Sequence, residues 1–397
     1  MFASWSFSLT ILAACQNLIR SFDFKRRNLI QVAILKTMTN YLLPKQKSRY
    51  DHQPIPPFEE LNLNKKEFKP VRGPTIYNNI IDAIGNTPLV KLNRIPKING
   101  LECDILVKCE YLNPSGSLKD RIASRMIEEA ENQNDIKPGY AIYEPSSGNT
   151  GIAMALVSAV KGYDCTIVMT KKMSDEKERT IKALGGNVVR GEIGKEYGEA
   201  GNIQMIAEEM QRHNPQSIVP NQYQNAYNPF AHYETTAEEI LWDCEGKLEM
   251  LVAGAGTGGT VTGLSRKIKE QIPHCKIIGV DAKGSVIGEH CNIDDFFYFD
   301  VEGIGHDYKP AVINYSQIDD WYNVTDKDSF TTARDLIRLE GLLVGGSSGS
   351  TVWSAIQACK KYGLKKGDKC VVILGDSIRN YMSKFIEDKW MAERNFI

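Results

Sequence analysis

The chain has 397 residues, 42% of them hydrophobic and 24% charged, which is an ordinary composition for a soluble globular protein of two or three domains. Its 48 Lys and Arg residues nearly balance 49 Asp and Glu residues, and a net charge of −1 argues against nucleic acid as a partner. The nine cysteines include no C-x-x-C pair, which indicates reduced thiols and favours a cytoplasmic location.

The N-terminal residues differ from the rest in composition. Residues 1–50 contain eight Lys or Arg and one acid, Asp23, a bias that organellar transit peptides share. The apolar run LTILAAC is too short to span a membrane, so we expect no membrane association. A polar, proline-rich stretch ends near Pro70 and reads as a linker. We therefore expect residues 1–74 to be a poorly ordered extension, with mitochondrial targeting as the alternative to a cytoplasmic location.

From about residue 75, short apolar runs alternate with longer amphipathic segments. The runs expected to be strands are CDILVKCE, YAIYEP, DCTIVMT, GNVVRG, SIVP, EMLVAG, CKIIGVD and CVVILG. The segments expected to be helices include DRIASRMIEEAENQ, GIAMALVSAVKG, DEKERTIKALG, ETTAEEILWDC and TVTGLSRKIKE. This alternation predicts an α/β fold of mainly parallel sheets flanked by helices. We expect two such domains, residues 75–225 and 226–397.

Four segments carry the residue types of a ligand site. They are rich in Gly, Ser, Thr or Asn, and each precedes an apolar helical pattern: NPSGSLKD, EPSSGNTG, AGAGTGGT and GGSSGST. In parallel sheets, ligands bind in the loops that lead from strands into helices. One glycine-rich loop is weak evidence for a site, whereas four that converge on one place are strong evidence.

The third of these loops admits two hypotheses. Gly254, Gly256 and Gly259 match the G-x-G-x-x-G pattern of dinucleotide sites, and Asp281 follows the next predicted strand, where a ribose-binding acid would lie. A dinucleotide, however, leaves three loops without a role. A phosphate monoester on a small aromatic aldehyde would use the backbone N–H groups and hydroxyls of this loop. It would also need a lysine elsewhere, for which Lys119 is the candidate.

The four segments NPSGSLKDR, EPSSGNTG, GAGTGGTVTG and GGSSGST, in this order, resemble the β-family (fold type II) of pyridoxal-phosphate enzymes. Within it, NQYQNAYNPFAHYETTAEEI, VEGIGHDYKP and VVILGDSIRNYMSKFIEDKWM are similar to the cystathionine beta-synthase branch of the cysteine synthase/cystathionine beta-synthase family. The likeness runs from about Ile76 to the end of the chain. It implies a tryptophan-synthase-β-like fold with pyridoxal 5′-phosphate in the cleft between two domains.

The resemblance also implies a role for each motif. Lys119 would be the catalytic residue and form the Schiff base with the cofactor, Asn149 would bond the ring hydroxyl, and Ser347 would face the pyridine nitrogen. The phosphate-binding residues would be Gly256, Thr257, Gly258, Gly259 and Thr260. The residues implied for the substrate are Ser146, Ser147, Gly148, Thr150, Gln222, Gly305 and His306. No metal is expected.

The activity that the resemblance implies is a carbon–oxygen lyase reaction of transsulfuration and cysteine biosynthesis. It condenses L-serine with L-homocysteine to L-cystathionine and water by β-replacement, and cysteine in place of serine would release hydrogen sulfide. Three alternatives stay open: a cysteine synthase that uses O-acetylserine and sulfide, a serine or threonine dehydratase, and a weakly active sensor or scaffold of the same fold. The family likeness further implies a homodimer.

The sequence departs from the family pattern in several places. Heme held by a Cys and a His is not expected, because Cys15 is the only cysteine before Cys103, although His52 is present. The sequence, which ends at Ile397, contains no counterpart of the C-terminal regulatory domain that binds S-adenosylmethionine in this family. We therefore expect no activation by S-adenosylmethionine. Ser146 replaces the usual threonine, and His306 replaces a tyrosine. Since histidine can change its charge near neutral pH, we expect this replacement to weaken or reshape the use of the second substrate.

Overall fold

The computed structural model describes residues 76–397, except 147, 171–173, 193–198, 200 and 293–294. All described residues belong to one compact unit. The expectations for residues 1–74 and for Ser147 lie outside the described residues. Within the described ranges, no helix combines the length and the apolar character needed to cross a membrane.

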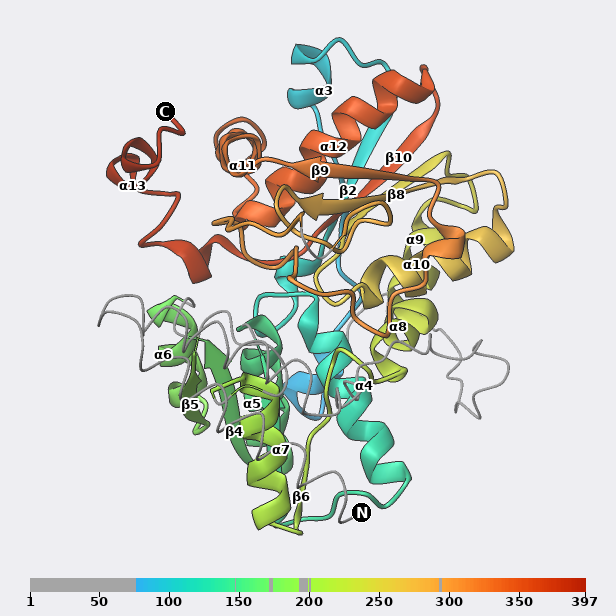
Figure 1. Ribbon diagram of the computed structural model, residues 1–397. Coiled ribbons are helices and arrows are strands. Elements are labelled where there is room, and N and C mark those ends of the chain that lie inside the picture. Colours follow the sequence, from blue (N-terminus) through green and yellow to red (C-terminus); the bar gives the residue numbers. More distant parts are fainter. Residues whose placement is uncertain (1–75, 147, 171–173, 193–198, 200, 293–294) are drawn as a thin grey trace, which may run out of the picture. The chain divides into compact units, whose positions relative to one another are not determined.

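The described strands form two sheets (Figure 1). The six-stranded sheet has the order β1–β2–β10–β7–β8–β9, with β1 Leu89–Lys91, β2 Asp104–Cys109, β7 Met250–Gly254, β8 Lys276–Ala282, β9 Asp320–Val324 and β10 Lys369–Leu374. The four-stranded sheet has the order β5–β4–β3–β6, with β3 Ala141–Pro145, β4 Asp164–Thr170, β5 Asn187–Gly191 and β6 Ser217–Ile218. Among the described strands, only β1 and β2 pair antiparallel. The α/β fold with mainly parallel sheets is therefore confirmed.

The described residues also contain a set of α-helices that connect the strands. They are α3 Ile95–Ile98, α4 Lys119–Asn132, α5 Asn149–Lys161, α6 Asp175–Ala183, α7 Ile203–His213, α8 Tyr227–Ala231, α9 Ala237–Asp243, α10 Gly259–Gln271, α11 Asp326–Glu340, α12 Gly346–Tyr362 and α13 Asp388–Glu393. One π-helical turn, His232–Thr236, joins α8 to α9. Helix α11 shows how the sequence sets the ends: Thr325 accepts a hydrogen bond from the N–H of Asp328, and Gly341 closes the helix with φ +73°.

The six-stranded sheet is buried on both faces. Because successive side chains of a strand point to opposite faces, Met250 and Val252 face one side and Leu251 and Ala253 face the other. The first pair packs with α11 and α12, and the second pair packs with α9 and α10. Burial on both faces explains why these strands read as continuous apolar runs in the sequence.

The four-stranded sheet has its own core. Ile142 of β3 and Ile167 of β4 pack with the apolar faces of α4 and α5. Helix α7 packs against the same two strands. Figure 1 shows α4 to α7 gathered around this sheet.

The two sheets do not coincide with the predicted domains on either side of residue 225. Strands β1 and β2 lie within residues 75–225, yet β2 pairs with β10 in the sheet that otherwise contains residues 226–397. The sequence signal for β1 is weak, because only three residues form it. The division into 75–225 and 226–397 stays a prediction.

The four glycine-rich segments do not all have the same structure. Three of them follow β2, β3 and β7 and lead into α4, α5 and α10, as expected. The fourth segment, GGSSGST, is helical from its second residue onward, because α12 begins at Gly346. Helix packing explains the difference: a Cβ at position 349 would lie 1.9 Å from the carbonyl oxygen of Ser329 in α11, so glycine there permits close contact between α11 and α12.

Candidate active site

A cavity that is partly open to solvent lies where these segments meet. The cavity is lined by Leu118, Lys119, Asn149, Gly254, Gly256, Thr257, Gly258, Thr260, Gly303, Ile304, Ser347, Thr351, Ile373, Gly375 and Asp376. The structure therefore brings together seven of the residues proposed for the catalytic and cofactor roles. The eighth, Gly259, follows Gly258 directly in the chain.

Lys119 is the first residue of α4, and the backbone fixes its position. The N–H of Leu118 donates to the carbonyl oxygen of Gly375 at 2.9 Å, which ties the start of α4 to the end of β10. The N–H of Lys119 donates to Ser117 Oγ at 3.2 Å. Burial lowers the pKa of Lys119 to about 8, and the carboxylate of Asp376 opposes that shift. A substantial fraction of the Lys119 amine is therefore neutral, and so nucleophilic and basic, near pH 8.

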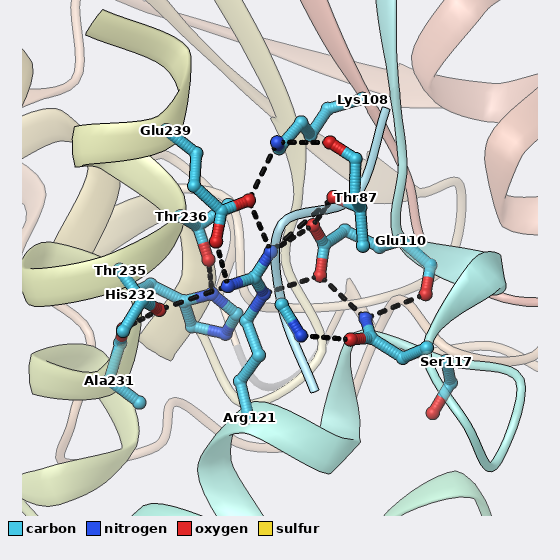
Figure 2. A network of polar contacts seen from close by, with 12 residues as sticks. Thr87, Lys108, Glu110, Ser117, Arg121, Ala231, His232, Thr235, Thr236 and Glu239 are labelled. Carbon is cyan, nitrogen blue, oxygen red and sulfur yellow. Dashed lines mark hydrogen bonds and ion pairs between the residues drawn. The ribbon is translucent and has the colours of Figure 1, made fainter. Parts of the chain in front are cut away.

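A buried cluster of charges anchors α4 two residues beyond Lys119 (Figure 2). The guanidinium of Arg121 donates from Nε to Glu110 at 2.7 Å and from Nη1 to Glu239 at 2.7 Å. Lys108 Nζ lies 2.7 Å from the second oxygen of Glu239, so two cations and two carboxylates balance. Burial alone would raise the pKa of Glu110, but Arg121 and Lys108 hold it at about 2. The first turn of α4 is thus held by long-range ion pairs.

The glycine–threonine loop leads from β7 into α10. Gly258 precedes the helix with φ +83°, and a Cβ there would lie 2.6 Å from Ile313 Cβ, so this position requires glycine. The first N–H groups of a helix have no partner within it, and the helix dipole favours an anion at this end. Thr257 and Thr260 add hydroxyl groups at the same place. The arrangement suits a phosphate group that is bound without a lysine in the loop.

Asn149 begins α5 and lies in a chain of amide and carboxylate groups. Its Nδ2 donates to Asp376 Oδ2 at 2.7 Å, and its Oδ1 accepts from Asn380 Nδ2 at 2.9 Å. The Asn149 amide also lines the cavity, which is compatible with a bond to a ring hydroxyl. Asp376 also accepts from the hydroxyl of Tyr381, and burial raises the pKa of Asp376. These contacts fix the orientation of the Asn149 side chain.

Ser347 lies in the first turn of α12 and also lines the cavity. Its side chain lies next to Gly303, where an added Cβ would lie 3.3 Å from Ser347 Oγ. A hydroxyl at this place can donate to or accept from a ring nitrogen without carrying a charge.

The predicted substrate residues form a second group beside the cavity. Thr150 Oγ1 donates to Gln222 Oε1 at 2.6 Å. Ser146 is fully buried, and its hydroxyl accepts from the N–H groups of Gly148 at 3.1 Å and Gly151 at 2.9 Å, so it also shapes the start of α5. Gly148 has φ +133°, where a side chain would be strained.

A buried carboxyl group holds Gln222 in place. Glu144 lies in β3, one residue before its end, and accepts from the backbone N–H groups of Asn221 at 2.9 Å and Gln222 at 3.2 Å. Burial raises the pKa of Glu144 to about 8, although these two hydrogen bonds oppose the shift. The Thr150–Gln222 contact therefore depends on a residue that the sequence analysis did not single out.

Gly305 and His306 lie outside the lining of the cavity, and their neighbours Gly303 and Ile304 line it instead. The His306 ring packs edge-on against Tyr223 and Tyr308, with centroid distances of 5.3 and 4.0 Å. His306 Nδ1 lies 2.5 Å from Asp307 Oδ1. His306 is connected to the site through Tyr223, which follows Gln222, so its role with the second substrate stays a prediction.

The structure adds a buried ion pair that the sequence analysis missed. Lys177 of α6 places its Nζ 2.5 Å from Glu302 Oε2, and both side chains are almost fully buried. The Lys177 side chain passes over Gly148, where an added Cβ would lie 2.4 Å from Lys177 Cδ. Because the two residues are 125 positions apart in the sequence, no local sequence pattern predicts this contact. Asp376 could have been found, since only Gly375 separates it from the apolar run of β10.

The cavity fits pyridoxal phosphate by the chemistry of its walls. It offers an amine of lowered pKa at Lys119, a loop of N–H and hydroxyl donors at a helix N-terminus, and a neutral hydroxyl at Ser347. Asp281 does not serve a ribose, because its oxygens accept from the backbone N–H groups of Ala282 and Gly288 and it is fully buried. The dinucleotide hypothesis therefore lacks the ribose-binding carboxylate that it requires.

Comparisons with known proteins agree with this geometry. Cystathionine beta-synthase of Rattus norvegicus is 51% identical over 330 residues, which are 83% of this chain and 58% of the relative. That of Dictyostelium discoideum is 46% identical over 323 residues, 81% of this chain and 64% of the relative. The chain thus spans about three fifths of the length of these curated relatives.

Solved structures show the same fold. A hydrogen sulfide-producing enzyme from Fusobacterium nucleatum matches 77% of this chain and 98% of its own, with 38% identity and a TM-score of 0.72. An O-acetylserine dependent cystathionine beta-synthase from Helicobacter pylori matches 78% of this chain and 98% of its own, with 34% identity and a TM-score of 0.72. The family model described as "Pyridoxal-phosphate dependent enzyme" matches residues 80–376. The chain therefore belongs to the family of pyridoxal-phosphate-dependent enzymes, on the fold type II scaffold that it shares with cystathionine beta-synthases.

Proposed function

We propose that this protein condenses L-serine with L-homocysteine to L-cystathionine and water by β-replacement. The observation that carries the proposal is the single cavity in which Lys119 meets the glycine–threonine loop and Ser347. Relatives named cystathionine beta-synthase, at 46–51% identity, support the choice of substrates.

Each residue of the site has a separate role in this reaction. Pyridoxal phosphate, when bound, supplies an aldehyde for the amino group of serine and a conjugated ring that takes up the electron pair of the α-carbon. Lys119 holds the cofactor and, once released by serine, takes the proton from the α-carbon with its neutral amine and later returns it. Asn149, Ser347 and the loop from Gly256 to Thr260 keep the ring in the orientation that this proton transfer requires.

The group around Thr150 binds the amino acid. Ser146, Gly148 and Thr150 lie at the start of α5, where N–H groups and hydroxyls favour a carboxylate. The resemblance adds Ser147 to this group. Gln222 fixes the Thr150 hydroxyl from the other side. A neutral hydroxyl at Ser347 does not enforce protonation of the pyridine nitrogen, and this favours loss of the β-substituent over transamination.

A second candidate is the cysteine synthase reaction of O-acetylserine with sulfide. It would use the same residues, and the Helicobacter pylori protein of the same fold is named as O-acetylserine dependent. The two reactions are distinguished by kcat/KM for serine with homocysteine and for O-acetylserine with sulfide, measured on one preparation. We expect the first pair to be preferred, and a higher kcat/KM for the second pair would contradict the proposal.

The pKa of Lys119 gives the direction of the pH dependence. A base with a pKa of about 8 is roughly a tenth neutral at about pH 7 and roughly nine tenths neutral at about pH 9. We therefore expect the exchange of the α-proton of saturating L-alanine with D₂O to become about tenfold faster over this range. L-Alanine has no β-leaving group, so proton NMR reports the α-proton alone. A flat or falling profile would show that Lys119 is not the base.

The position of His306 predicts a change in the second half of the reaction. His306→Tyr should lower KM for homocysteine and raise cystathionine formation, because a phenol restores the family residue against Tyr223. Serine binding, followed by the spectral change of the cofactor, should not change. His274→Gln, at an exposed position, is the control. Equal homocysteine saturation in wild type and His306→Tyr would make His306 a bystander.

Assembly and location complete the proposal. We infer a homodimer and a cytoplasmic location, with hydrogen sulfide release from cysteine as a side reaction. The dimer is supported by family likeness and is tested by light scattering after size-exclusion chromatography, where a monomeric mass would contradict it.

A further inference from the structure

The segment α8 to Thr236 packs directly on the N-terminus of α10, which carries the glycine–threonine loop. A Cβ on Gly259 would lie 2.0 Å from Asn228 Oδ1, and a Cβ on Gly263 would lie 2.0 Å from the carbonyl oxygen of Pro229. The residues that follow Pro229 include a π-helical turn, His232–Thr236. Such turns are rare and occur often at functional sites, where they aim particular side chains.

Asn228 donates a hydrogen bond to the hydroxyl oxygen of Thr257 in the loop. Its Nδ2 donates to Thr257 Oγ1 at 2.9 Å and to the carbonyl oxygen of Gln222 at 2.7 Å. The N–H of Gly259 also donates to Thr257 Oγ1, at 3.4 Å. A hydroxyl has two acceptor lone pairs and one donor hydrogen. Two donors therefore saturate the oxygen of Thr257 and leave its hydrogen for another acceptor.

His232 contacts the hydroxyl of Thr260, the second threonine of the loop. Its Nε2 lies 3.2 Å from Thr260 Oγ1. Its Nδ1 lies 2.9 Å from Thr236 Oγ1 (Figure 2). The side chain is fully buried, and burial lowers the pKa of His232 to about 3. His232 is therefore neutral at working pH, with one ring nitrogen as a donor and the other as an acceptor.

The two neutral tautomers have opposite effects on Thr260. With the proton on Nε2, the imidazole donates to Thr260, whose hydroxyl hydrogen stays free. With the proton on Nδ1, Thr260 must donate to the imidazole and cannot donate to an anion. Thr236 can serve either tautomer, since its hydroxyl both donates and accepts.

The loop has no charged group of its own to hold a phosphate dianion. Residues 254–263 contain no Lys or Arg, so the anion depends on N–H and O–H donors. Hydrogen bonds to an ionised acceptor are roughly twice as strong as neutral ones. The tautomer that frees the Thr260 hydrogen is therefore the favoured one beside a phosphate.

We propose that Asn228 and His232 are positioning residues that turn the hydroxyl hydrogens of Thr257 and Thr260 towards the cofactor phosphate, with His232 in the Nε2–H form. The inference rests on the assignment of the loop to the phosphate. Neither residue touches the substrate, and both act through the two threonines.

The first test is a double-mutant cycle on cofactor affinity. The cofactor is removed from the purified protein, and the Kd of pyridoxal phosphate is measured by fluorescence titration. His232→Leu should raise this Kd about 10- to 100-fold, the loss expected for one charge-assisted hydrogen bond. In the Thr260→Val background the same substitution should have little effect, because its target hydroxyl is gone. His232→Gln should recover part of the affinity, since its amide can donate to Thr260.

The second test reads the tautomer in unaltered protein. In ¹⁵N-histidine-labelled holoenzyme, with His232→Gln used to assign the signal, His232 should show a protonated Nε2 and an unprotonated Nδ1. His274→Gln is the control for both tests, because His274 is exposed. An Nδ1–H tautomer overturns the inference, and so does an unchanged Kd in His232→Leu. Wild-type protein that fails to bind pyridoxal phosphate would instead overturn the proposed function.

Discussion

Lys119→Ala is expected to lower β-replacement by about 10³-fold or more, because it removes both the amine that holds the cofactor and the base that moves the α-proton. The visible absorption band that covalent attachment gives the cofactor should also disappear. Pyridoxal phosphate should still bind, since Asn149, Ser347 and the loop are unchanged. Steady-state kinetics, absorption spectra and equilibrium dialysis check the three outcomes.

The control for this experiment is Lys389→Ala, which removes a lysine whose side chain is 85% exposed. It should keep the wild-type activity and spectrum. Lys119→Ala protein that retains more than about a tenth of the wild-type rate would contradict the assignment of Lys119 as the base.

The second large effect concerns stability. Arg121→Met should lower the free energy of unfolding by about 3–5 kcal/mol, because it leaves the buried carboxylates of Glu110 and Glu239 without their main cation. Urea denaturation at a fixed, saturating concentration of pyridoxal phosphate measures the loss. Arg338→Met, at a position that is 67% exposed, should change stability by no more than about 0.5 kcal/mol.

The same variant has a defined pH dependence. The folded-state pKa of Glu110 is about 2, below its ordinary value of 4.5, so the ion pair contributes stability above about pH 4.5 and loses it as the pH falls. Arg121→Met lacks this contribution. The difference in stability between wild type and variant should therefore shrink as the pH is lowered from about 6 towards 3. A difference that is constant with pH would show that packing, not the ion pair, causes the loss.

The sequence predicted the parts of the fold that depend on local patterns. Apolar runs such as that of β7 and β10 are buried on both faces, and a parallel strand of this kind is visible without its neighbours. Seven of the eight residues proposed for the catalytic and cofactor roles line one cavity, because the segments that follow β2, β3 and β7 meet there with the start of α12.

The parts that the sequence could not predict depend on contacts between distant residues. Lys177 reaches Glu302 across 125 residues, and Arg121 reaches Glu239 across 118. The π-helical turn at His232 has no sequence signature, since its residues also fit an ordinary helix. Ser347 was expected in a loop because serine and glycine favour turns, but packing of α12 against α11 decides the conformation there.

Identification of the product tests whether this site joins serine to homocysteine. Protein saturated with pyridoxal phosphate is incubated with homocysteine and with L-serine labelled with ¹³C at the β-carbon, and the mixture is analysed by mass spectrometry. We predict cystathionine that carries the label, formed by wild-type protein and not by Lys119→Ala. Labelled cystathionine that fails to form, while O-acetylserine and sulfide yield cysteine, would contradict the account.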